Sequence, residues 1–149
     1  MILVASNAED GPGFLLSGFA STPFTLAGVS YASMDSFAQS IKFQDPSDQR
    51  RIAAKKSRRA LYEGNRLSKS NYVYYDGKGL PKRGVEHLAL LEQAFRAKID
   101  QNEAVREALL STGNEEFVVK VGVDDLPADR FTLLLGRVRA ELRRSIPLS

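Results

Sequence analysis

The most regular pattern of hydrophobic and polar positions lies in the second half of the chain. In two segments there, apolar residues recur at three- and four-residue steps, which is the spacing of one buried helical face. The apolar residues of the first segment are Val85, Leu88, Leu91, Phe95 and Ile99, and those of the second are Phe131, Leu134, Leu135, Val138 and Leu142. We predict a long helix in each segment, the second capped by Asp129. Their shared core is expected to contain Leu88, Leu91, Phe95, Leu134, Leu135 and Val138.

Three further helices are expected from start and stop signals. A serine cap opens the segment 33–41, whose apolar positions lie on one face and whose first turn contains Asp35. Residues 45–48 form a second start signal, because a capping aspartate precedes a proline. We predict that this helix continues to about Tyr62. A shorter helix is expected over residues 103–111, before a glycine suited to a left-handed cap.

Short strands are expected between these helices. The apolar residues 1–5 and 117–121 have the composition of buried strands. Residues 23–31 alternate around an Ala-Gly turn and predict a small hairpin. Residues 71–84 combine tyrosines with three glycines and a proline, which predicts a short strand followed by a mobile loop. The pattern as a whole indicates an α+β fold, with one helix-rich domain over residues 1–149 and a small N-terminal β element.

Composition narrows the chemistry that is open to the chain. The chain is 43% hydrophobic and 26% charged, as globular proteins usually are, and it contains no cysteine and one histidine. The lack of cysteine excludes disulfides, thiolate zinc sites and a cysteine nucleophile. The single histidine, His87, would need an orienting carboxylate to act as a general base, and the adjacent Glu86 points elsewhere on a helix. We therefore expect His87 to be a surface or packed residue, and we expect no metal site and no cofactor.

The sequence shows no membrane-targeting segment. The apolar residues 1–5 are too few for the hydrophobic region of a signal peptide, and acidic residues follow soon after them. No apolar run approaches the ~18 residues that cross a bilayer. We expect a cytoplasmic location and no membrane partner.

A cluster of positive charge follows the second helix start signal. Six of the ten residues from Arg50 to Arg59 are lysine or arginine, although the net charge of the whole chain is only +3. Such a run is either a solvated helix face or a contact for a phosphate-bearing partner, and both interpretations stay open. Nearby tyrosines at the start of segment 71–84 are able to stack on bases, but tyrosines in strands more often pack or form hydrogen bonds. A nucleic acid is thus one candidate partner.

Three carboxylates are candidates for chemistry. Asp35 follows a segment rich in glycine and aromatic residues, and a carboxylate at a helix N-terminus can lie at the mouth of a cleft. The helix dipole is expected to keep it ionised. Asp124 and Asp125 follow the late strand and are candidates for a second carboxylate. The competing interpretation is structural, with Asp35 a first-turn acid and the other two residues part of a turn.

Short sequence blocks occur in an order and at a spacing that resemble the N-terminal signature of the NADAR superfamily. These blocks are Leu16-Ser17-Gly18-Phe19-Ala20, Pro23-Phe24, Gly28-Val29-Ser30-Tyr31, Asp35-Ser36-Phe37-Ala38-Gln39 and Lys42-Phe43. The similarity continues through residues 64–66, 94–99 and 109–113 and into the final helix, so that it covers most of residues 14–143. The order of the blocks is more specific than any single block.

The resemblance implies a NADAR-like fold and a class of reaction. The family includes N-glycosidases that act on ribosyl-linked compounds, among them riboflavin-pathway intermediates and ADP-ribosylated guanine, so the implied reaction is cleavage of a C1–N ribosyl bond. The glutamate of the family aligns with Asp35, and a later acidic residue of the family aligns with Asp124 or Asp125. The candidate ligand-binding residues are Ser17, Gly18, Phe19, Gln39, Lys42, Phe43, Gly64, Arg66, Arg83 and Lys98. Among them, Lys42 and Arg66 are expected to hold phosphate and Phe19 or Phe43 to stack on a base.

The chain departs from the family pattern at several of these positions. The family glutamate is the shorter Asp35, the following histidine is Ser36, and an asparagine is Gly18. The chain contains no tryptophan, and Arg83 lies near the place of the family's active-site tryptophan. A tryptophan- and glycine-containing segment is replaced by residues 124–130. Two function classes follow: a divergent N-glycosidase that uses Asp35, and a non-catalytic module that binds an ADP-ribose-like nucleotide or a protein partner.

Overall fold

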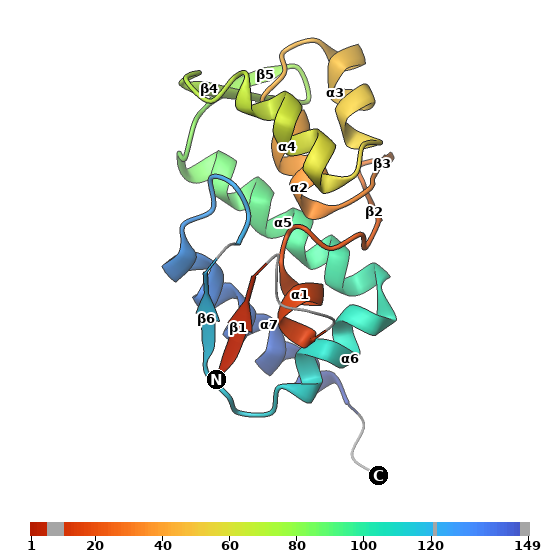
Figure 1. The fold of residues 1–149 in the computed structure, drawn as a ribbon, viewed down its shortest axis with the longest axis vertical. Helices are drawn as coiled ribbons and strands as arrows, with labels where there is room; N and C mark the ends of the chain where they lie inside the picture. Colours follow the sequence, from red (N-terminus) through yellow and green to blue (C-terminus); the bar gives the residue numbers. More distant parts are fainter. Residues whose placement is uncertain (6–10, 121, 147–149) are drawn as a thin grey trace.

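Two strands far apart in the sequence form the first sheet. The computed structural model describes residues 1–5, 11–120 and 122–146. Strand β1 (Ile2–Val4) pairs in parallel with β6 (Phe117–Val119), with Leu3 opposite Val118. Both strands lie where the sequence predicts them, although the predicted end of the second, Val121, lies outside the described residues. The pair lies at one end of the molecule, beside the N-terminus (Figure 1).

Two antiparallel hairpins lie toward the opposite end (Figure 1). The first joins β2 (Phe24–Leu26) to β3 (Val29–Tyr31), as predicted, through a turn whose two residues have φ of 50° and 81°. The second joins β4 (Tyr72–Tyr75) to β5 (Lys78–Pro81). The expected mobile loop after one strand is therefore wrong. Asp76-Gly77 has positive φ at both positions, which is the geometry of a tight hairpin turn.

Seven helices are present in the described residues. They are α1 (Pro12–Leu16), α2 (Met34–Ser40), α3 (Pro46–Ala53), α4 (Ser57–Asn65), α5 (Val85–Gln101), α6 (Glu103–Ser111) and α7 (Ala128–Ser145). The prediction of one helix from residue 46 to Tyr62 is wrong, because the chain is extended at Lys56 and a new helix starts at Ser57. The Ser57 hydroxyl donates to the Phe19 carbonyl at 2.8 Å and forms a second hydrogen bond with the Ser33 hydroxyl at 2.7 Å between oxygens. These hydrogen bonds to distant segments fix the position of the first turn of α4.

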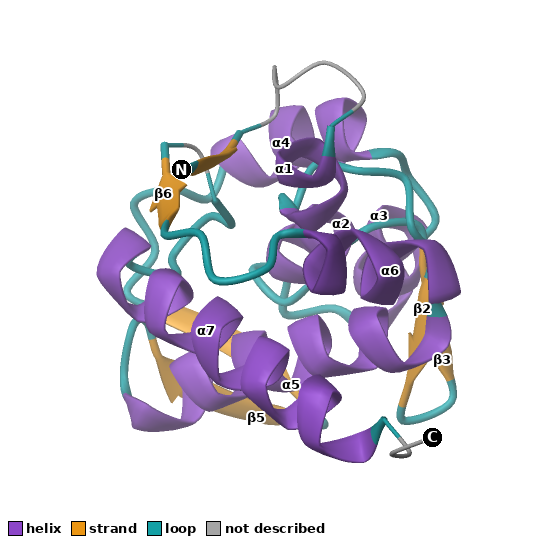
Figure 2. Cartoon of the chain, turned by 90° about the horizontal axis from the view of Figure 1, so that it is seen from below, coloured by secondary structure: helices purple, strands orange, loops and turns teal. Residues whose placement is uncertain are grey.

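Helix α5 runs through the middle of the molecule and joins its two ends (Figure 1). It packs against α2 and β5 on one side and against α6 on the other. Helix α6 packs against α1, α5 and α7, and Figure 2 shows these helices from below. The predicted core is confirmed: Leu88, Leu91, Phe95, Leu134, Leu135 and Val138 are all buried in one cluster. The rings of Phe95 and Phe131 meet edge to face at 5.2 Å between centroids.

Helix ends differ from the prediction in two places. The apolar pattern places Val85 on the buried face of α5, but Val85 is the first residue of the helix and 83% of its surface is exposed. Helix α7 is preceded by Pro127 rather than capped by Asp129, which lies in the first turn. The glycine after α6, Gly113, has φ of 59° and ends that helix as predicted. Within the described ranges, no helix has the length and apolar content needed to span a membrane.

Two glycine-to-alanine changes are expected to have opposite effects on stability. A Cβ at Gly13 would lie 1.8 Å from the backbone oxygen of Leu3, so α1 would have to move off β1. Gly13→Ala should lower the free energy of unfolding by about 2 kcal/mol or more. Gly136, inside α7, has open space around it, and Gly136→Ala should raise that free energy by about 0.5–1 kcal/mol. Urea unfolding of both variants checks the sign of each change in the free energy of unfolding. A Gly13→Ala protein as stable as wild type would contradict the tight contact between α1 and β1.

Candidate functional site

A cavity of about 380 Å³ lies where four segments meet. The segments are the loop after α1, the first turn of α2, one face of α4, and the loop between β6 and α7. The residues that line it are Phe19, Asp35, Leu61, Asn65, Gly122, Val123 and Asp124. Phe19 and Asp35 come from the first half of the chain, and the last three come from the second. The cavity therefore joins the first part of the chain to the second.

Asp35 lies in this cavity with only 6% of its surface exposed. Ser33 caps α2 by accepting a hydrogen bond from the Ser36 N–H, and the Asp35 N–H donates to the Gly18 carbonyl at 2.9 Å. Burial raises the pKa of Asp35 to about 7, and the neighbouring Lys98 partly opposes this. Burial therefore opposes the ionisation that the dipole of α2 is expected to favour.

Asp124 has the opposite electrostatic environment in the same cavity. Its Oδ2 accepts hydrogen bonds from Lys42 Nζ at 2.6 Å and from Gln39 Nε2 at 3.0 Å. Burial alone would raise the pKa of this carboxyl, but the bonds from Lys42 and Gln39 outweigh it and hold the pKa below its ordinary value. The cavity thus contains one carboxyl group that binds a proton near neutral pH and one that stays ionised.

Lys98 approaches Asp35 from the core. Its side chain is fully buried, and its Nζ donates to the Ser17 carbonyl at 2.6 Å. Burial lowers the pKa of Lys98, while the charge of Asp35 favours the protonated form. Ser17 therefore acts through its backbone, and its hydroxyl is bonded to Phe14 O at 2.7 Å. Lys98 helps to set the charge of Asp35 without lining the cavity.

Two glycines are required by the packing around this site. A Cβ at Gly18 would lie 2.5 Å from Val123 Cγ2 and 2.9 Å from Asp35 Oδ1. The asparagine that NADAR proteins have there would overlap Asp35 in this chain. A Cβ at Gly64 would lie 1.8 Å from Gln39 Oε1, so α4 can pack on the Gln39 side chain only with glycine at this position. Both glycines support the site without contributing a functional group.

Other predicted site residues lie outside the cavity lining. The guanidinium of Arg66 is exposed and pairs with Glu63 at 3.4 Å, and Phe43 contributes its carbonyl to a bond from Gln49. Asp125 has φ of 70°, and its buried carboxyl faces Arg83, whose Nε lies 3.3 Å away. Of the two alternative late carboxylates, the structure therefore brings Asp124 to Asp35.

His87 is buried rather than exposed, in agreement with the packed alternative. Its Nδ1 accepts a hydrogen bond from the Arg83 N–H at 2.8 Å, so its Nε2 carries the proton in the neutral ring. Burial lowers the pKa of His87. His87 Nε2 and Asp125 Oδ2 are both buried, and neither finds a hydrogen-bond partner among the described residues.

Sequence reasoning missed four residues of the cavity. Leu61 and Asn65 come from α4, whose separate start at Ser57 was not predicted. Gly122 and Val123 immediately precede Asp124 in the chain. A Cβ at Gly122 would lie 2.8 Å from the Phe131 ring, and a Cβ at Gly18 would lie 2.5 Å from Val123 Cγ2. Residue Asn65 lies in a block that resembles the NADAR pattern, which is the one signal that points to it.

Comparison with known proteins places the chain in a family. The NMR structure of the E. coli protein YbiA matches with a TM-score of 0.70 and 22% identity, over 96% of this chain and 84% of that one. This likeness shows that the two chains share a fold. No curated protein sequence matches the chain. The sequence pattern of the family described as bacteriophage protein GP30.3 matches residues 12–134, which is most of the chain. The chain therefore belongs to the bacteriophage protein GP30.3 family.

Proposed function

We propose that the protein is an N-glycosidase that hydrolyses a C1–N ribosyl bond in an ADP-ribosyl or ribosyl-phosphate compound. The observation that supports this most is the pair Asp35 and Asp124, two carboxyl groups of one cavity with pKa values displaced in opposite directions. Hydrolysis of a glycosidic bond uses one carboxyl group to exchange a proton and another to stay charged. The resemblance of the blocks around Asp35 to NADAR proteins supports the ribosyl substrate.

The two carboxyl groups have different roles in the proposed reaction. Protonated Asp35 donates its proton to the leaving nitrogen as the C1–N bond breaks, and its carboxylate then takes a proton from the attacking water. That water forms the new C1–O bond, so the products are the free base and the ribosyl compound with a hydroxyl at C1. The positive charge that develops on the ribose is stabilised by ionised Asp124. A pKa near 7 suits a group that both gives and accepts a proton.

The cavity fits part of a nucleotide better than a complete ADP-ribose. Its volume of about 380 Å³ is at the lower end of the range for small-molecule sites. Phe19 and Leu61 provide apolar surface for a sugar or base, and Asn65 provides an amide that can donate and accept. Lys42 reaches this lining through its bond to Asp124. We expect the ribose and one phosphate in the cavity, with the rest of the ligand outside.

Two observations favour the non-catalytic alternative. Lys42 and Gln39 both occupy the same oxygen of Asp124, and the first acid is an aspartate where NADAR proteins have the longer glutamate. A carboxyl group displaced by about 1 Å can lose about a hundredfold in rate. In this alternative the cavity binds an ADP-ribose-like nucleotide without turnover.

A panel of ribosyl compounds distinguishes the two functions. The purified protein is incubated with ADP-ribose, NAD and N-ribosyl phosphate compounds, binding is measured by calorimetry, and free base is measured by chromatography. The N-glycosidase predicts binding and base release for at least one compound. Binding without base release supports the alternative. If the protein neither binds nor cleaves any of these compounds at millimolar concentration, both functions are contradicted.

The dependence of base release on pH is expected to follow Asp35. Because Asp35 must be protonated to donate, kcat/KM should fall as pH rises through about 7. The charge of Lys98 lowers the pKa of Asp35, so Lys98→Met should move this fall to higher pH. Lys69→Met, on the surface, is the matched control and should leave the profile unchanged. If Lys98→Met does not change the pH at which kcat/KM falls, Asp35 is excluded as the titrating group.

A further inference from the structure

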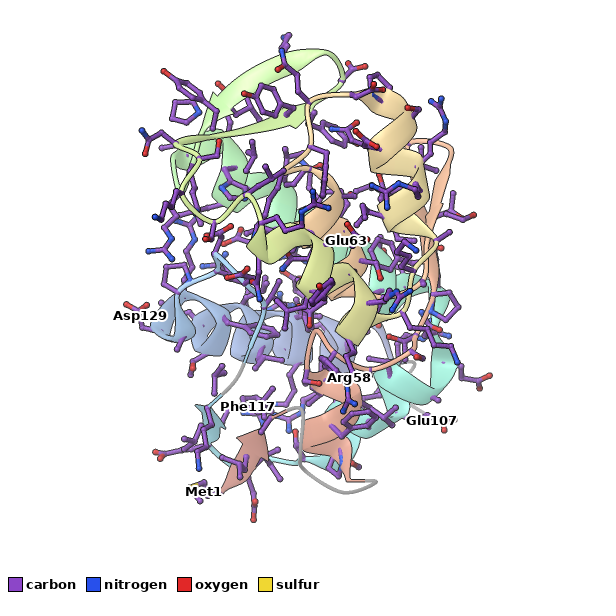
Figure 3. All side chains as sticks on the ribbon, turned by 45° about the horizontal axis from the view of Figure 1, so that its top comes forward. Met1, Arg58, Glu63, Glu107, Phe117 and Asp129 are labelled. Carbon is purple, nitrogen blue, oxygen red and sulfur yellow. The ribbon has the colours of Figure 1, made fainter. Side chains whose placement is uncertain are left out.

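Helix α4 carries a second hollow, outside the candidate site, with a volume of about 370 Å³. It is lined by Lys56, Arg58, Arg59 and Tyr62. All four residues are exposed, and 69% of the surface of Tyr62 is in contact with solvent. Figure 3 shows Arg58 near the N-terminal end of the helix and Glu63 farther along it. An exposed aromatic ring among cations has no role in the packing of the core.

The positive charge of this hollow is not neutralised within the described part of the chain. Glu63, one turn beyond Arg59 on α4, pairs instead with Arg51 and Arg66. In contrast, Lys56, Arg58 and Arg59 form no ion pair with any described carboxylate. The aliphatic parts of these side chains cover apolar surface while their charged groups stay in water. The hollow is therefore available to an anionic ligand.

The hollow adjoins the candidate site along one helical face. Residues at positions i, i+3, i+4 and i+7 lie on the same side of a helix. In α4 this row is Arg58, Leu61, Tyr62 and Asn65. Leu61 and Asn65 line the cavity of Asp35, whereas Arg58 and Tyr62 line the hollow. A chain-like ligand that crosses α4 would contact both.

We propose that this face of α4 binds single-stranded nucleic acid. Arginine guanidinium groups bind phosphates in pairs of hydrogen bonds, and an exposed tyrosine between them offers a stacking surface for an unpaired base. In a duplex the bases are already stacked, so Tyr62 would be unused. A membrane-binding helix would present a row of exposed apolar residues, but Ala60 is buried and Leu61 lines the cavity. The proposal goes beyond the proposed function and does not depend on it.

Fluorescence anisotropy with a labelled oligothymidylate of about 12 nucleotides tests the proposal. The oligonucleotide carries no ADP-ribosyl group, which is the part that the cavity of Asp35 is proposed to bind. Asp35→Asn should therefore bind the oligonucleotide as wild type does. Wild type should bind the single strand more tightly than the duplex of the same sequence. Arg58→Gln/Arg59→Gln should weaken binding at least about tenfold and reduce the salt slope by about 1.4, since each lost phosphate contact contributes about 0.7. Tyr62→Ala should also weaken it about tenfold, and Tyr62→Phe should retain it.

The matched control removes the same charge from another helix. Arg137→Gln/Arg144→Gln, on exposed positions of α7, should leave both affinity and salt slope unchanged. The proposal is overturned if wild type fails to bind at about 50 mM salt, if both double variants weaken binding equally, or if the duplex binds as well as the single strand. Binding to phosphatidylserine vesicles but not to the oligonucleotide also overturns it, because the cations would then serve a lipid surface.

Discussion

Asp35→Asn is expected to abolish base release while ligand binding persists. The amide has nearly the shape of the carboxyl group, but it cannot donate a proton to the leaving nitrogen or take one from water. Loss of a general acid–base group typically lowers kcat by about 100- to 10,000-fold. The affinity for the ribosyl ligand should change by no more than about threefold, because the lost interaction belongs to the transition state.

Parallel assays of base release and calorimetric binding measure this split. Asp100→Asn, which replaces an exposed carboxylate on α5, is the control for the change of charge and should keep both properties. If Asp35→Asn releases base as fast as wild type, Asp35 has no catalytic role. If neither protein releases base but both bind, the cavity is a binding site only.

The same substitution is expected to stabilise the fold at alkaline pH. A folded-state pKa of about 7 for Asp35, against 3.8 in the unfolded chain, means that ionisation opposes folding. The penalty is absent below about pH 4, grows between about pH 4 and 7, and is complete above that range. Each tenfold change in proton affinity is worth about 1.4 kcal/mol, so the full penalty is up to about 4 kcal/mol. Asp35→Asn does not carry this penalty.

Urea unfolding at two pH values tests this expectation. At about pH 8, Asp35→Asn should be more stable than wild type by up to about 4 kcal/mol, and at about pH 4 the two should differ by less than about 1 kcal/mol. Burial lowers the pKa of Lys98, so at the higher pH this side chain gains little from a charged partner. Asp100→Asn should match wild type throughout. Equal or lower stability of Asp35→Asn at the higher pH would show that Asp35 ionises without cost.

The helical core could be predicted because its signal is local. In α5 and α7 the buried residues recur at helical spacing, and packing agrees with that pattern everywhere except Val85 at the helix start. The break between α3 and α4 could not be predicted in the same way. No glycine or proline interrupts residues 47–63, and the break depends on the bonds that Ser57 makes to Phe19 and Ser33.

The second hairpin did carry a local signal. Asp76-Gly77 between two short runs of strand-forming residues is a common two-residue hairpin turn. The glycines that follow it, among them Gly79 in β5, favour a loop when they are considered alone. Pairing of Lys78–Pro81 with Tyr72–Tyr75 outweighs this preference, since Val73 and Leu80 are buried together.

The sequence could predict some of the residues that form the site, but it could not predict their electrostatic environment. The position of Asp35 follows from its block in the sequence, whereas its protonation depends on burial among Gly18, Val123 and Lys98, which come from three distant segments. The choice between Asp124 and Asp125 depends on one backbone angle, because the positive φ of Asp125 turns its carboxyl toward Arg83. Spacing in the sequence contains neither kind of information.

Carbon NMR of the aspartate carboxyl groups, followed as a function of pH, tests most directly whether the two acids of the cavity differ in protonation. The carboxyl carbon of Asp35 should titrate near pH 7, and that of Asp124 should titrate below 3.8. The difference should disappear in the unfolded protein, because it arises from burial and from the bonds to Lys42 and Gln39. Titration of both groups together near the ordinary value for aspartate would contradict the proposed division of roles between Asp35 and Asp124.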